Sequence, residues 1–184
     1  MSATNRGTKR AEADFYPTPI PVIHKFLEQY KIKEGAILEP CAGNGNFIRA
    51  IREKGYTNSI IANELRVEEI DNLKEVGANK VYTYDFLKDT VPEDVQTIIT
   101  NPPYSLAEEF VRNCKEKYPN AEIIMLLRLA FLESKKRFDF WKQYPVSDLY
   151  ILSQRPSFTG KGTDATAYAW FVWNSEGKQK VKVI

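Results

Sequence analysis

Strand-like and helix-like segments alternate along most of this chain, and this alternation constrains the fold more than any other feature. Short aliphatic and β-branched runs are each followed by a longer segment with helical character. Parallel neighbouring strands need a long crossover, usually a helix, so the alternation predicts a parallel sheet with right-handed connections. We expect five such strands, within the segments "GAILEP", "SIIANE", "NKVYTYDF", "VQTIIT" and "AEIIMLLR".

The last two strand-like segments, "DLYILSQ" and "AYAWFVWN", have no helical segment between them. They are joined instead by "RPSFTGKGTDAT", a loop rich in glycine and polar residues. Strands joined without a crossover helix pair antiparallel, so we expect a hairpin at one edge of the sheet. The chain is therefore predicted to be an α/β protein with a mostly parallel seven-stranded sheet and a C-terminal antiparallel hairpin.

The domain organisation is expected to be simple. A length of 184 residues suits one domain, and no internal repeat or linker indicates a second. Residues 1–13 are small and polar, which predicts a flexible N-terminal arm, and residues 14–184 are expected to form a single domain. A helix is predicted from about Pro21 to Tyr30, after an extended proline-rich piece.

Composition excludes several classes of protein. Two cysteines do not make a disulfide scaffold, and with one histidine they disfavour a zinc site. The longest apolar run is too short and too interrupted to span a bilayer, and no secretory signal follows Met1. A net charge of +2 gives no overall polyelectrolyte character. We expect a reduced, soluble, cytoplasmic protein without a membrane partner.

The stretch "TIITNPPYS", residues 97–105, ends a strand abruptly. Its first four residues are all β-branched, as in a strand buried on both faces. The two prolines then stop the strand, because neither has an N–H group. Ser105 is predicted to cap the following helix, with Glu108 as its reciprocal partner. Such a stiff turn lies at the carboxyl end of a parallel sheet, where α/β proteins bind ligands.

A glycine turn and three acidic residues mark the ends of earlier strands. "LEPCAGNG" contains Glu39, Gly43 and Gly45, and "NEL" and "YDF" contain the other two acids, Glu64 and Asp85. The turn is neither a dinucleotide fingerprint nor a phosphate loop, because the third glycine and the Gly-Lys-Ser/Thr sequence are absent. A carboxylate there suits an ammonium group, and an acid after the second strand suits ribose hydroxyls. Each acid also has a structural alternative: Glu39 could cap a helix, Glu64 could place a favourable charge at a helix start, and Asp85 could form an Asx turn.

The ordered set "DFYPTP", "LEPCAGNG", "NEL", "YDF" and "NPPY" resembles S-adenosylmethionine-dependent amino-methyltransferases of the DNA N6-adenine type. The segments "LLRLAFLESKKRFDFW" and "LSQRPSFTGKGTDATAYAWFVW" are similar to small phage and prophage members of that group. The resemblance runs from Asp14 to Trp173 and implies a Rossmann-like class I methyltransferase fold. It also implies DNA methylation as the activity, with S-adenosyl-L-methionine as cofactor.

Carried over residue by residue, the resemblance implies a cofactor site and a catalytic turn. Glu64 would hold the cofactor ribose, and Asp85 with Phe86 the cofactor adenine. The side chain of Asn101 and the carbonyl of Pro102 would accept hydrogen bonds from the exocyclic amine of the substrate. Tyr104 would stack on a target base that has been flipped out of the duplex. The methionine end of the cofactor would meet Tyr16, Thr18, Glu39, Ala42, Gly43 and Gly45.

Larger DNA methyltransferases carry a separate target-recognition region, and none is expected here. Base reading would then come from two loops that mix basic and aromatic residues, "LAFLESKKRFDFW" and "RPSFTGKGTDAT". The expected substrate contacts are Pro103, Arg128, Arg155, Phe158 and Lys161. DNA is the expected partner, with RNA as the alternative, in a bacterial or phage-infected cell. A homo-oligomer or a recognition subunit would supply further specificity.

Other functions stay open on the sequence. RNA adenine-N6 methylation, DNA cytosine-N4 methylation and methylation of a protein glutamine amide use similar turns. A catalytically inactive subunit that binds nucleic acid or cofactor is the alternative of a different class. A cytosine-C5 enzyme would need a cysteine in the substrate turn, but Cys41 lies in the cofactor turn and Asn101 occupies the other.

Overall fold

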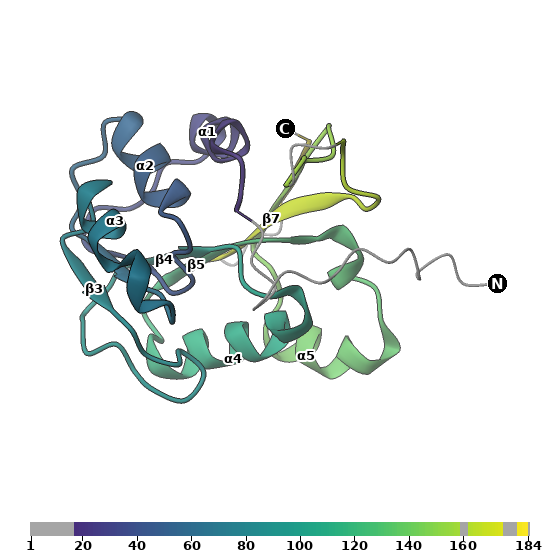
Figure 1. Ribbon diagram of the computed structural model, residues 1–184. Helices are drawn as coiled ribbons and strands as arrows, with labels where there is room; N and C mark the ends of the chain where they lie inside the picture. The colour runs from purple at the N-terminus through teal and green to yellow at the C-terminus, as the bar shows by residue number, and fades with distance from the viewer. Residues whose placement is uncertain (1–16, 159–161, 175–179, 184) are drawn as a thin grey trace.

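A computed structural model of the protein describes residues 17–158, 162–174 and 180–183. Within them, the strands form one sheet in the order β3-β2-β1-β4-β5-β7-β6-β8 (Figure 1). The bounds are β1 (Ile37–Glu39), β2 (Ile60–Asn63), β3 (Lys80–Tyr82), β4 (Thr97–Thr100), β5 (Glu122–Arg128), β6 (Asp148–Ile151), β7 (Tyr168–Trp173) and β8 (Lys180–Val183). The predicted arm at residues 1–13 lies outside the described residues.

The strand directions confirm the predicted α/β architecture. Strands β1 to β5 pair parallel, and β7 pairs antiparallel with both β5 and β6. The seven predicted strands all form, and the last two make the expected antiparallel hairpin. The structure adds β8 from the basic tail, which pairs parallel with β6 at the edge of the sheet.

Helices cover both faces of the sheet. Helices α1 (Ile20–Gln29), α2 (Asn46–Glu53) and α3 (Ile70–Glu75) lie on one face, and α4 (Ala107–Lys117) and α5 (Phe138–Gln143) lie on the other (Figure 1). Short 3-10 helices precede or follow them, at η2 (Val67–Glu69), η3 (Tyr104–Leu106), η4 (Leu129–Phe131) and η5 (Lys135–Arg137). No helix among the described residues has the length and apolar character that crossing a bilayer requires.

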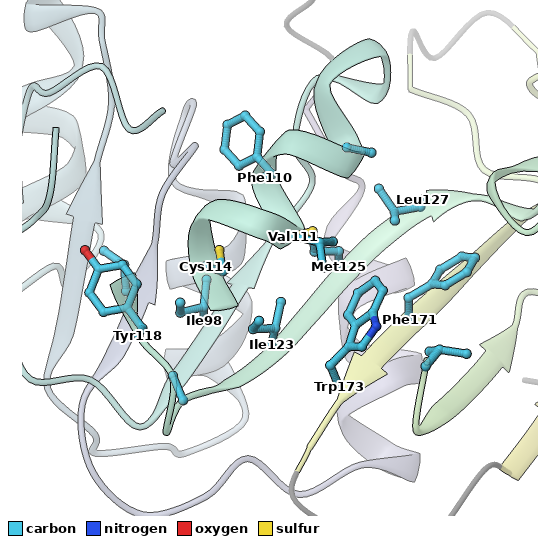
Figure 2. Packing of buried hydrophobic residues seen from close by; sticks show 14 of the residues in the cluster. Ile98, Phe110, Val111, Cys114, Tyr118, Ile123, Met125, Leu127, Phe171 and Trp173 are labelled. Atoms are coloured by element: carbon cyan, nitrogen blue, oxygen red, sulfur yellow. The ribbon is translucent and has the colours of Figure 1, made fainter. Parts of the chain in front are cut away.

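Alternate residues of each central strand enter opposite cores, which explains why the strands carry no polar face. In β5, Ile123, Met125 and Leu127 pack with the α4 residues Phe110 and Val111 (Figure 2). The intervening strand residues pack instead with α1 and α2. Each fully buried aliphatic side chain contributes roughly 1.5–3 kcal/mol of transfer free energy, so two layers of helices stabilise the short strands. This packing fixes the strand ends from which the site is built.

The prediction for the start of α4 was wrong. Tyr104 to Leu106 form a 3-10 turn, so α4 begins at Ala107 and its N-cap is Leu106, without a side-chain cap. Ser105 therefore does not cap the helix, and Glu108 pairs with Arg112 one turn later at 2.9 Å. The backbone of Leu106 donates to the carbonyl of Pro103, which satisfies the turn internally.

Candidate functional site

A cavity of about 490 Å³ opens at the carboxyl ends of the parallel strands. Its wall is built by the loops after β1, β2, β3, β4 and β5 and by residues 17–18 of the N-terminal segment. The sheet order reverses between β1 and β4, and such a switch point separates loops that leave in opposite directions. The cavity therefore lies where α/β sheets bind ligands, and its volume suits a ligand of nucleotide size.

The glycine turn after β1 is tied to the end of β2. Gly43 has φ +56° and its N–H donates to Glu64 Oε2 at 2.7 Å, across 21 residues of sequence. The other oxygen of Glu64 accepts from the backbone N–H of Arg66 at 3.1 Å and from its Nε at 3.0 Å. Ala42, Gly43 and Glu64 all line the cavity.

Gly45 has a different position from the one expected. It has φ +81° and precedes α2, and it does not line the cavity. A Cβ at this residue would lie 2.6 Å from Cγ2 of Val76, just after α3. Gly45 is therefore required for the close approach of two helices on one face of the sheet.

Glu39 is the most deeply buried carboxyl group near the cavity. It is 1% exposed, lies behind the residues that line the wall, and accepts a hydrogen bond from the N–H of Cys41 at 3.2 Å. Burial raises the pKa of Glu39 to about 8, and the neighbouring Glu64 carboxylate raises it as well. The group is therefore largely protonated at neutral pH, and a nearby cation would favour its ionised form.

Asp85 and Phe86 form the wall after β3. Asp85 pairs with Lys88 at 2.7 Å, and this contact lowers the pKa of the Asp85 carboxyl. Its Oδ1 also accepts from the N–H of Leu87 at 3.3 Å, so the Asx turn considered above is present. Phe86 is buried and stacks on Phe110 at 5.5 Å, which gives the cavity an apolar surface beside an acceptor.

The turn after β4 faces the same cavity and is tied to the N-terminal segment. Asn101 Nδ2 donates to Thr18 Oγ1 at 3.0 Å, although the residues are 83 positions apart. Thr18 is 2% exposed, and its carbonyl accepts from Asn46 Nδ2 at 2.9 Å. Thr18 thus orients the amide of Asn101 through its hydroxyl, while its backbone is held separately by α2.

Tyr104 lies at the far side of this turn, between two other side chains. The guanidinium of Arg128 lies over the Tyr104 ring, with Cζ 4.9 Å from the centroid. The ring of Tyr168 lies 5.5 Å from that of Tyr104 at an angle of 55°. Burial raises the pKa of the Tyr104 hydroxyl, so this side chain stays neutral at all physiological pH values.

The expected substrate residues are divided between several places. Pro103 and Arg128 line the cavity. Arg155 instead lines a second hollow, with Lys25 of α1. Phe158 packs edge-on against Tyr168, with ring centroids 5.2 Å apart, and supports the ring that contacts Tyr104. Two predicted residues, Tyr16 and Lys161, lie outside the described residues.

One residue that shapes the cavity, at the end of β2, was not predicted. Asn63 is 1% exposed at the end of β2; its Nδ2 donates to the carbonyls of Pro40 and Tyr84, and its Oδ1 accepts from the Tyr84 N–H. It thereby joins the loops after β1 and β3. Arg137 donates to the carbonyls of Ala130, Phe131 and Glu133 and fixes the loop after β5. An asparagine inside the aliphatic run "IIAN" was the available signal for Asn63.

Comparison with known proteins gives a fold but no family. No family model and no curated protein sequence matches the chain. Among solved structures, it is similar to a protein of Pyrococcus horikoshii provisionally described as an RNA methyltransferase (16% identity, 99% of this chain and 95% of that one, TM-score 0.67). It is also similar to the 23S rRNA methyltransferase ErmE (16%, 86% and 69%, 0.63) and a SAM-dependent O-methyltransferase of Thermotoga maritima (17%, 84% and 64%, 0.57).

The fold is that of the class I methyltransferases. The likeness extends over nearly the whole chain in the first comparison, so it includes the hairpin strands as well as the parallel half of the sheet. This confirms the predicted fold class. At such low sequence identity, the structural similarity establishes the fold and nothing further.

Proposed function

We propose that this protein transfers a methyl group from S-adenosyl-L-methionine to an exocyclic amine of a nucleic-acid base, most specifically adenine N6 in DNA. The observation that carries the proposal is that the "NPPY" turn and the glycine turn open into one cavity. A cofactor methyl group and a substrate amine have to meet in one place. These two loops are 58 residues apart at Gly43 and Asn101, and the sheet brings them to the same edge.

The residues of the cavity fit the cofactor. Glu64 and Asp85 offer carboxylate oxygens at successive strand ends, where ribose hydroxyls and an adenine amine need acceptors. Phe86 and Phe110 supply an apolar wall for an adenine ring. Thr18 and Glu39, with Ala42 and Gly43, lie on the side of the methionine end in the proposed assignment. When bound, the cofactor supplies an electrophilic methyl group on a sulfonium.

Asn101 and Pro102 would bind the substrate amine. The lone pair of an exocyclic adenine nitrogen is delocalised into the ring, so the nitrogen is a poor nucleophile. Two acceptors directed at its hydrogens favour a pyramidal nitrogen and thereby direct its lone pair at the methyl group. Because Asn101 Nδ2 is bonded to Thr18, the amide presents its oxygen away from Thr18. The consecutive prolines keep the carbonyl of residue 102 in place, and such fixed orientation contributes much of the rate.

Adenine in a duplex cannot reach this turn, because N6 lies inside the base stack. The base must be flipped out of the helix and held, and Tyr104 is the aromatic residue next to the proposed acceptors. Its neutral hydroxyl and half-buried ring suit stacking on a base more than acid–base chemistry.

RNA is the second candidate substrate. Two of the similar solved structures are described as RNA methyltransferases, and a single-stranded RNA adenine needs no flipping. DNA cytosine-N4 methylation would use the same acceptors. An inactive binding subunit is less well supported, because Asn101, Tyr104, Glu64 and Asp85 all line the cavity.

Transfer of tritiated methyl groups to separate pools of DNA, RNA and protein tests the proposal. We expect label in a nucleic-acid pool, and we expect Asn101→Ala and Tyr104→Ala to lose transfer while cofactor affinity, measured by calorimetry, is retained. Asn120→Ala makes the same chemical change at an exposed turn outside the cavity and should behave as the parent. Parental transfer rates in the Asn101 variant would remove this turn from the mechanism.

A further inference from the structure

The ring assigned to base stacking is covered by a cation in this structure. Arg128 ends β5, lines the cavity and places its guanidinium carbon 4.9 Å from the centroid of Tyr104. A planar guanidinium over an aromatic face occupies the same kind of space as a stacked base. An adenine stacked on this face of Tyr104 and the present position of Arg128 are therefore mutually exclusive.

Arg128 is held only weakly in this position. Its side chain is exposed, and its Nε donates to the hydroxyl of Tyr168 over a long 3.5 Å. Among the described residues, no carboxylate lies within the ion-pair distance of 4.0 Å from the Arg128 guanidinium. An exposed cation–π contact favours the covered state roughly two- to fivefold, whereas stacking a base on an aromatic ring strengthens binding roughly five- to 150-fold. A base can therefore displace the guanidinium.

The partners of Arg128 connect it to the loop between β6 and β7. Tyr168 donates its hydroxyl proton to Asp164 Oδ2 at 3.0 Å, and the Asp164 N–H donates to the carbonyl of Pro156. The N–H of Leu129, next to Arg128, donates to the carbonyl of Ala167 at 2.8 Å. The backbone at Arg128 is thus fixed, whereas its exposed side chain is held by the contacts with Tyr104 and Tyr168.

We infer that Arg128 holds the place of the target base over Tyr104 and moves to a nucleotide phosphate when the base enters. This inference rests on the proposed function, since it assigns Tyr104 to base stacking. The side chain is long and cationic, lines the cavity and is exposed to solvent, so it can reach the phosphates that flank a flipped nucleotide. Arg128 then lowers the affinity for an isolated base and raises the affinity for a base carried by a polynucleotide chain.

Arg128→Gln should strengthen the binding of an isolated base and weaken the binding of a polynucleotide. Because these two effects have opposite signs in one variant, the test is specific. Binding of 2-aminopurine riboside, which has no phosphate, is followed by fluorescence in the presence of S-adenosylhomocysteine. We expect the riboside to bind about two- to fivefold more tightly than to the parent. Binding of a 12-residue oligo(dA) should weaken, and its log–log salt slope should fall by about 0.7.

Two further variants complete the test. Arg128→Lys keeps the charge and should retain most of the salt slope. Lys142→Gln removes a cation that lies 4.3 Å from the Phe138 ring outside the cavity and should leave riboside binding unchanged. Unchanged or weaker riboside binding by Arg128→Gln overturns the place-holding role, and an unchanged salt slope overturns the phosphate contact. Failure of the proposed function is separate, because the parent would then methylate no nucleic acid.

Discussion

Replacing Glu39 with glutamine should change how the stability of the protein depends on pH. Burial raises the pKa of this carboxyl from the ordinary 4.5 to about 8 in the folded chain. The folded state therefore resists ionisation that the unfolded chain undergoes freely. The difference in unfolding free energy between the parent and Glu39→Gln should not depend on pH below pH 4. As the pH rises towards 8, the parent should lose stability relative to the variant.

The size of this effect follows from the two pKa values. Between pH 4.5 and 8 the linkage amounts to about 3 pKa units of differential proton binding, or about 4 kcal/mol at 1.36 kcal/mol per unit. Other titrating groups are common to both proteins and cancel in the difference. Glu64, the charged group that faces Glu39 most directly, is retained in both.

Urea denaturation of both proteins at pH 4.5, 6, 7 and 8 measures the difference. We expect the stability of the Glu39→Gln protein relative to the parent to increase with each rise in pH. Parallel curves of unfolding free energy against pH would mean that the carboxyl of Glu39 titrates as in water, which would contradict the raised pKa. Under the proposed cofactor role, calorimetry in buffers of different ionisation enthalpy should also detect a proton released from Glu39 on cofactor binding at pH 7.

Three other substitutions test separate contacts. Thr18→Val removes the acceptor for Asn101 and should lower kcat about tenfold in a methyl-transfer assay, whereas Thr18→Ser should restore it. Asp85→Ala should weaken cofactor binding about tenfold by calorimetry, and unchanged affinity would remove this residue from the cofactor site; the exposed Asp89→Ala is its control. Gly45→Ala should lower the free energy of unfolding, measured in urea, by at least about 2 kcal/mol. Gly55→Ala is the control, because Gly55 has the same φ of +81° but open space around it, and it should cost less. Equal costs would contradict the packing argument.

The sheet could be predicted because its signals are local. Strands such as Thr97–Thr100 are buried on both faces, and an uninterrupted β-branched run is the direct consequence of that burial. Strand β8 was missed because its pairing with β6 depends on an edge that exists only after the hairpin has formed. The 3-10 turn after the two prolines was missed because the capping pattern of Ser105 fits a helix start that the backbone does not adopt.

The gathering of strand-end residues at one edge of the sheet could be predicted, but the contacts among them could not. Acidic residues at three strand ends and the "NPPY" turn are visible in the sequence, and a parallel sheet brings strand ends together. The bond between Thr18 and Asn101 spans 83 residues, and no periodicity encodes it. The same holds for Arg128 over Tyr104, since one residue ends a strand and the other starts a turn on its neighbour.

Mass spectrometry of nucleosides from methylated DNA and RNA tests the central claim most directly. DNA and RNA incubated with the protein and S-adenosyl-L-methionine labelled in the methyl group are digested completely to nucleosides. We expect the label in N6-methyladenosine or its deoxy form, in DNA by preference, and none when Asn101→Ala replaces the parent. Label on a carbon or a ribose oxygen, or equal labelling by the variant, would contradict amine methylation at this turn.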